Sequence, residues 1–161
     1  MAAKQTTRSR ILSESTQAPI TRVDLLKRLG KLMERTVVVY FTSSGVIIDD
    51  GDVSIISDVL DHVKTDGRLL VVLSSAGGDI LAAERVIRTL RSYSPDGEYE
   101  VLVPHKAKSA ATLICMGATR IYMSKTSEFG PVDPQMLRKV GNNVYMMSVA
   151  SVVESYRELL S

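Results

Sequence analysis

The sequence has 161 residues, of which 45% are hydrophobic and 24% are charged, and its formal net charge is +2. This length and composition predict one globular domain with a sizeable core. The net charge is too small to indicate nucleic-acid binding, and no apolar run is long enough for a membrane span. The N-terminus lacks the apolar segment of a signal peptide, so we expect a cytoplasmic protein.

A single cysteine, Cys115, excludes an internal disulfide and any zinc site built on several thiolates. It falls within an apolar run, so we expect a buried, unreactive thiol. The sequence has neither the spacing of a phosphate-binding loop nor a metal-ligand motif. We therefore expect no metal and no cofactor.

Residues 1–35 are basic, with eight Lys or Arg against three Asp or Glu. Apolar residues recur at helical spacing between Asp24 and Met33, so we interpret this region as a basic N-terminal arm and helix. The arm is either a solvated segment or a contact for an acidic partner. Residues 36–161 are interpreted as the single globular domain.

Aliphatic runs alternate with helical patterns through this domain. Strands are predicted at 36–41, 68–74, 99–104 and 120–124, and the first two are expected to be buried. Helices are predicted within 49–63 (with Asp50 or Asp52 as N-cap), 80–90, 109–116 and 145–160. A loop from Lys125 to Gln135 follows the last strand. Strands alternating with helices predict α/β layers around a largely parallel sheet.

Two strand ends carry the residues that suggest chemistry. The first is "SSAGGD" (74–79), which lies between a predicted strand and a predicted helix. Its glycines, Gly77 and Gly78, allow the backbone to approach a ligand and to point N–H groups at it. Ligands bind at such strand ends in open α/β sheets. The alternative is a tight turn in which Asp79 caps the next helix.

The second strand end is "KSAATLIC" (108–115), which places Ser109 at the predicted start of a short helix. Unpaired N–H groups there would stabilise an oxyanion, and the small side chains of Ala110 and Ala111 leave room for a substrate. The alternative is that Ser109 only caps the helix. Adjacent parallel strands would bring both stretches to one edge of the sheet, which is the arrangement that acyl transfer requires.

Together with "SEFGPVDPQ" (127–135), these blocks resemble the serine dehydrogenase proteinase (SDH) family. This family is a branch of the Clp protease/crotonase superfamily and is related to signal peptide peptidase A. The resemblance implies a spiral of ββα units and serine peptidase chemistry on peptides or unfolded protein segments. It implies Ser109 as nucleophile, Gly77 and Gly78 as the oxyanion glycine pair, and the Ala110 N–H as second donor. It also implies a homo-oligomer, a trimer or a hexamer.

The sequence departs from the family pattern at the general base. Clp peptidases carry a catalytic histidine where this chain reads "GPVDPQ", and His62 and His105 do not match that position. Ser–Lys peptidases carry their lysine near the position of Ala150. Our candidates are Lys139 as the base and Asp133 as a residue that orients a partner or caps the loop.

Three functions stay open at this point. The paired motifs favour a serine peptidase that acts through Ser109. The missing histidine favours a catalytically inactive protein that binds or assembles through the same fold. An acyl-CoA enzyme of the crotonase type is disfavoured, because a serine stands where such enzymes carry acidic catalytic residues.

Overall fold

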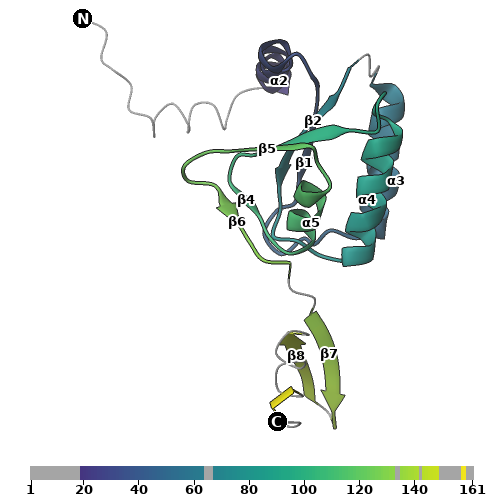
Figure 1. Ribbon diagram of the computed structural model, residues 1–161, viewed down its shortest axis with the longest axis vertical. Helices are drawn as coiled ribbons and strands as arrows, with labels where there is room; N and C mark the ends of the chain where they lie inside the picture. The colour runs from purple at the N-terminus through teal and green to yellow at the C-terminus, as the bar shows by residue number, and fades with distance from the viewer. Residues whose placement is uncertain (1–18, 64–66, 133–134, 142, 149–156, 159–161) are drawn as a thin grey trace, which may run out of the picture.

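The computed structural model describes residues 19–63, 67–132, 135–141, 143–148 and 157–158. Its body is a parallel sheet of four strands with helices packed against it (Figure 1). In spatial order these strands are β1 (Thr36–Phe41), β2 (Leu69–Ser74), β3 (Tyr99–Val103) and β5 (Arg120–Met123). The predicted α/β fold with a largely parallel sheet is confirmed.

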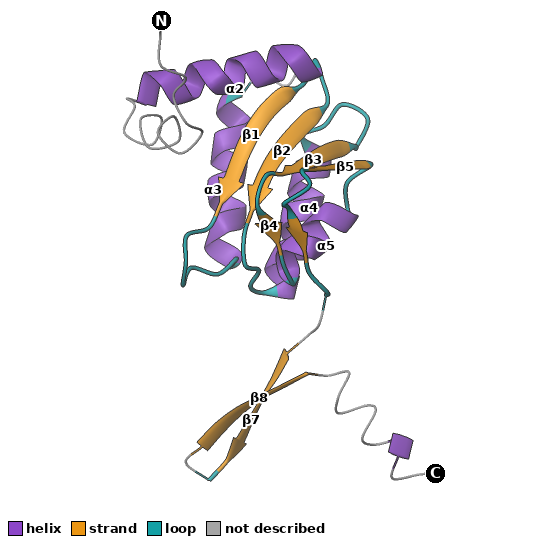
Figure 2. Ribbon diagram, turned by 90° about the vertical axis from the view of Figure 1, so that its left-hand side faces the viewer, coloured by secondary structure: helices purple, strands orange, loops and turns teal. Residues whose placement is uncertain are grey.

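Helices α3 (Asp50–His62), α4 (Ile80–Ser92) and α5 (Ala110–Met116) connect these strands in turn. Because each strand lies beside its predecessor and crossovers between parallel strands are right-handed, the three helices pack on the same face. A further helix, α2 (Pro19–Met33), lies across the beginning of β1 (Figure 2). Within the described ranges no helix has both the length and the apolar character needed to cross a membrane.

The core lies between the sheet and the layer of α3, α4 and α5. Alternate residues of each strand point into it, so that Val38 and Tyr40 of β1 are buried while their neighbours Val39 and Phe41 are 48% and 66% exposed. At β1 the sheet is therefore covered on one face and open on the other, so the prediction of a buried strand at 36–41 is wrong for the open face, whereas β2 and β3 are largely buried on both faces. This asymmetry follows from placing every crossover helix on the same side.

The helix caps decide where α3 and α4 begin. Asp49 caps α3, because its carboxylate accepts from the Gly51 N–H at 2.8 Å and from the Asp52 N–H, while the Asp52 carboxylate accepts from the Asp49 N–H at 2.9 Å. This reciprocal pair is a capping box, so the prediction of Asp50 or Asp52 as N-cap is wrong by one or more residues. Asp79 caps α4, as the alternative interpretation of residues 74–79 predicts.

The predicted loop after β5 contains a short strand, β6 (Glu128–Phe129), which pairs in parallel with β4 (Lys106–Ala107). Strands β7 (Gln135–Val140) and β8 (Asn143–Ser148) then form an antiparallel hairpin, which Figure 1 draws apart from the body. The helix predicted from residue 145 is therefore wrong for 145–148, because pairing across a turn at Gly141 (φ 60°) competes with the helix. Residues 149–156 of that prediction lie outside the described residues.

Candidate active site

The two strand ends singled out in the sequence meet at one edge of the sheet. Strands β2 and β3 are parallel neighbours. Beyond their ends the Ser75 N–H donates to the Lys106 carbonyl at 3.0 Å, and the Lys108 N–H donates to the Ser75 carbonyl at 3.2 Å. The predicted juxtaposition of the two stretches is therefore observed.

Gly77 packs directly against the backbone that carries Ser109. Its φ is 104°, and a Cβ atom on Gly77 would lie 2.8 Å from the Ser109 Cβ and 2.6 Å from the Lys108 carbonyl oxygen. The backbone of Gly78 is equally close to Ile48, because a Cβ there would lie 2.3 Å from the Ile48 nitrogen. Both positions therefore require glycine for the approach of another backbone segment.

Ser109 has an unusual backbone conformation, with φ 50° and ψ −121°. It occupies the N-cap position of α5, but its side chain makes no capping hydrogen bond. An ordinary N-cap serine has extended backbone dihedrals and its hydroxyl accepts from the first turn. The interpretation of Ser109 as a capping side chain is therefore wrong. Strained residues of this kind cost about 1–3 kcal/mol and cluster at functional sites.

Hydrogen bonds from the segment after β6 hold this strained turn. The Ser109 N–H donates to the Pro131 carbonyl at 3.2 Å, and the Gly130 N–H donates to the Ala107 carbonyl at 2.8 Å. The buried Thr112 hydroxyl lies 3.0 Å from the Ala107 carbonyl oxygen and 2.8 Å from that of Gly130. The first two residues of the "GPVDPQ" block therefore fix the Ser109 turn through their backbone groups.

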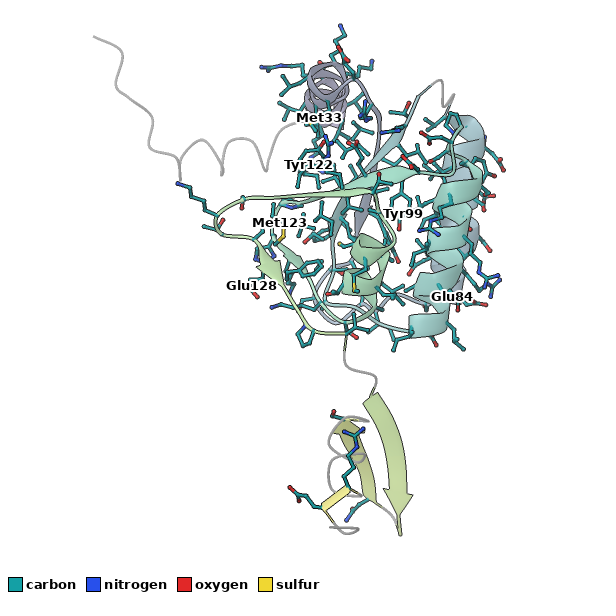
Figure 3. The ribbon with its side chains drawn as sticks, viewed as in Figure 1. Met33, Glu84, Tyr99, Tyr122, Met123 and Glu128 are labelled. Atoms are coloured by element: carbon teal, nitrogen blue, oxygen red, sulfur yellow. The ribbon has the colours of Figure 1, made fainter. Side chains whose placement is uncertain are left out.

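Tyr99 fixes the other end of α5. It lies on the side of the sheet that faces α4 and α5 (Figure 3), and its hydroxyl donates to the Ile114 carbonyl at 2.6 Å. Burial raises the pKa of the Tyr99 hydroxyl, which therefore stays protonated and remains a donor. Because α5 is anchored at both ends, the direction of its first N–H groups is set by the fold.

Ser75 is a positioning residue that sequence reasoning missed. It is fully buried, and its hydroxyl oxygen accepts from the Gly77 N–H at 3.0 Å and from the Thr42 hydroxyl at 2.7 Å. These bonds fix the loop that places Gly77 against Ser109. The signal available in the sequence was a serine two residues before a glycine, a spacing that allows a side chain-to-backbone turn.

Two backbone donors accompany Ser109. The Ile48 N–H donates to the Gly77 carbonyl at 2.9 Å, and the Asp79 N–H donates to the Ile48 carbonyl at 2.8 Å. The Gly78 N–H therefore points away from Ile48, as directions alternate along a strand. Within the described part of the chain, neither the Gly78 N–H nor the Ala110 N–H donates a hydrogen bond. Gly78 is partly exposed, whereas Ala110 is fully buried.

The ionisable side chains near the turn make no hydrogen bond to Ser109 within the described residues. Lys108 Nζ lies 2.9 Å from Glu128 Oε2 on the outer side of β6 (Figure 3), and this hydrogen bond lowers the pKa of the Glu128 carboxyl. His105 is exposed, and its carbonyl accepts from the Glu128 N–H. Among the residues that the structure describes, no base hydrogen-bonds to the Ser109 hydroxyl.

Of the two remaining predicted residues, the structure describes only Lys139. Asp133 lies outside the described residues. Lys139 is on β7, opposite Val144 of β8, in the hairpin that lies apart from the body (Figure 2). The roles of Lys139 and Asp133 stay predictions.

A strained serine on a strand-to-helix turn, beside free backbone donors, is typical of hydrolases that use serine as a nucleophile. Comparison with known families agrees with that class. The chain matches the family model of ClpP-like SDH-type serine proteinases over residues 5–157 and belongs to this family.

Two similar proteins from the archaeon Methanocaldococcus jannaschii are themselves uncharacterized. MJ0137 is 38% identical over 66 residues, which cover 41% of this chain and 22% of the relative. MJ1495 is 31% identical over 86 residues, which cover 53% of this chain and 26% of the relative. The matched stretches thus span about a quarter of each relative.

Proposed function

We propose that this protein hydrolyses peptide bonds in peptides or unfolded protein segments, with Ser109 as the nucleophile. The observation that carries this proposal is the strained Ser109 turn, packed against Gly77 with its hydroxyl unused as a cap. Membership of a serine proteinase family supports the reaction class.

The chemistry follows from the groups around the turn. The Ser109 oxygen attacks the peptide carbonyl carbon, and its proton passes to a base. The carbonyl oxygen becomes an oxyanion that accepts from the Gly78 and Ala110 N–H groups, and each such donor lowers the barrier by about 2.7–4 kcal/mol. The C–N bond then breaks, and the amine leaves with the proton. Water hydrolyses the acyl-enzyme and restores the serine.

The base is the part of the proposal that needs a further element. Lys108 is not our candidate, because its ammonium group is directed at the Glu128 carboxylate. Lys139 is our candidate, with Asp133 as the group that orients it. Lys139 reaches Ser109 only if the β7–β8 hairpin rearranges or the hairpin of another copy enters the site. This requirement is consistent with our expectation of a homo-oligomer, a trimer or hexamer.

The test is labelling with a fluorophosphonate probe, which reacts with activated serines, on the full chain. We expect stoichiometric labelling that is lost in Ser109→Ala and retained in Ser54→Ala, an exposed serine on α3. Loss of labelling in Lys139→Ala would support that residue as the base. Labelling that persists in Ser109→Ala would refute Ser109 as the nucleophile.

The second candidate is an inactive member of the family that binds or assembles. It is favoured by the lack of a base at Ser109 within the described residues. Absence of labelling at every pH between about 6 and 9, in a sample shown to be folded, would overturn the peptidase proposal and favour this one.

A further inference from the structure

The outer edge of β1 is a strand edge with free backbone groups. β1 is the first strand of the sheet, and the N–H groups of Thr36 and Thr42 donate toward β2. Because directions alternate along a strand, the N–H and carbonyl groups of Val37, Val39 and Phe41 point outward. No hydrogen bond within the described residues reaches these outward N–H groups.

This edge lacks the features that usually prevent pairing with another chain. The strand reads "TVVVYF" and contains no charge, no proline and no glycine. Val39 and Phe41 are 48% and 66% exposed on the open face of the sheet. Figure 2 shows that α2 lies over the beginning of the strand only. An uncharged, apolar strand edge of this kind is favourable for strand addition.

The apolar surface continues from the strand onto α3. Ile55 and Val59 are 61% and 43% exposed, and they line one groove together with Val39 and Phe41. A lone extended peptide would pair with β1 but would bring no helix to cover Ile55 and Val59. A second copy of the chain brings both a β1 edge and an α3 helix, and the distance between its sheet and its helix layer is the same.

We propose that two copies of this chain pair through β1, antiparallel, about a two-fold axis that passes beside Val39. Val39 then faces Val39 of the partner subunit, and Val37 faces Phe41 of the partner subunit. All three outward residues of each strand find a partner. A two-fold axis normal to the sheet keeps both helix layers on one side, so the two α3 helices become antiparallel neighbours and bury Ile55 and Val59.

The pair forms a continuous sheet of eight strands, twice the four of one copy. The carboxyl ends of the strands point in opposite directions in the two halves, so the two Ser109 sites lie at opposite ends and stay open. A closed assembly that contains two-fold axes can include this pair. The pairing is independent of whether Ser109 is a nucleophile.

Cross-linking through single cysteines tests the register. The only natural cysteine, Cys115, is buried, so an introduced thiol is the reactive one. Directly opposed residues with paired backbone groups lie about 5.5 Å apart at Cα, which is within reach of a disulfide. We expect Val39→Cys to form a disulfide-linked dimer under mild oxidation.

Phe41→Cys is the matched control. Its two copies would lie about 13 Å apart, at four residues of about 3.3 Å each, which is too far for a disulfide. We expect no self-cross-link for Val37→Cys or Phe41→Cys alone, but a cross-link when the two variants are mixed. Failure of Val39→Cys to cross-link, or equal cross-linking of Phe41→Cys, would overturn the proposal.

Sedimentation of the full chain gives an independent readout. We expect an assembly with an even number of copies, whose mass halves in Val39→Lys and is unchanged in Leu81→Lys, a control residue that is 70% exposed on α4. Ser109→Ala should leave the mass unchanged. A monomeric wild-type chain, or a mass unaffected by Val39→Lys, would show that the β1 edge serves another strand and would refute the pairing.

Discussion

Replacing Gly77 by alanine tests the contact on which the candidate site depends. Alanine at φ 104° is strained by about 1–3 kcal/mol. Its Cβ would also lie 2.6 Å from the Lys108 carbonyl oxygen and 2.8 Å from the Ser109 Cβ. Such overpacking destabilises the folded state by a further amount of about 1–3 kcal/mol. We expect Gly77→Ala to lower the free energy of unfolding by about 2–6 kcal/mol in total.

The matched control is Gly97→Ala. Gly97 also has a positive φ, 70°, but a Cβ there would meet no atom within 4 Å. It should cost only the backbone strain, about 1–2 kcal/mol. For a chain of this length each kcal/mol lowers Tm by about 2–4 °C, so the two variants are distinguishable by thermal unfolding.

The two variants should also differ in reactivity. Any shift that accommodates the new Cβ of Gly77→Ala moves Ser109, so labelling by the fluorophosphonate should be lost, while Gly97→Ala keeps it. The reasoning is refuted if Gly77→Ala unfolds at the same temperature as Gly97→Ala and is labelled at the wild-type rate.

Three further predictions concern other buried groups. Ser75→Ala removes the acceptor of two hydrogen bonds and should cost about 1–3 kcal/mol in urea unfolding and slow the labelling. Burial alone would raise the pKa of the Glu100 carboxyl, but hydrogen bonds from Arg35 and Tyr122 outweigh it and lower the pKa. The ionised Glu100 carboxylate stabilises the fold above the unfolded-state pKa of about 4.3, and this stabilisation is lost as the pH falls through the lower folded-state pKa. Glu100→Gln should therefore lower the free energy of unfolding by about 1–3 kcal/mol at pH 7, and by less at about pH 3. Burial raises the pKa of the Cys115 thiol to about 12, so a disulfide reagent at about pH 8 should modify it only after unfolding; fast reaction of the native chain would contradict its burial.

Local patterns in the sequence were sufficient for most of the fold. The aliphatic runs predicted β1, β2, β3 and β5 almost to the residue. Continuous aliphatic runs suit strands covered on both faces, as β2 and β3 are, whereas β1 is open on one face and β5 is mostly exposed. The same alternation of strands and helices predicted that residues 74–79 and 108–115 meet at one edge. That conclusion needs only the rule that neighbouring parallel strands end on the same side.

Predictions failed where two local preferences compete. Residues 145–148 fit both a helix and the second strand of a hairpin, and pairing with β7 decides for the strand. Asp49, Asp50 and Asp52 are all able to cap α3, and only the reciprocal bonds between Asp49 and Asp52 select one of them. Neither choice is encoded in one residue, because each depends on a partner elsewhere.

By itself the sequence determined which residues form the sheet and which serine and glycines lie at its edge. Only the tertiary structure decided how they are held there. Ser109 keeps its unusual φ because Gly77 packs against it and the Ser75 hydroxyl holds the Gly77 loop by hydrogen bonds. These contacts join backbone segments that are about 30 residues apart along the chain. A strained conformation persists only when the surrounding packing determines it, and that packing exists only once the sheet has formed.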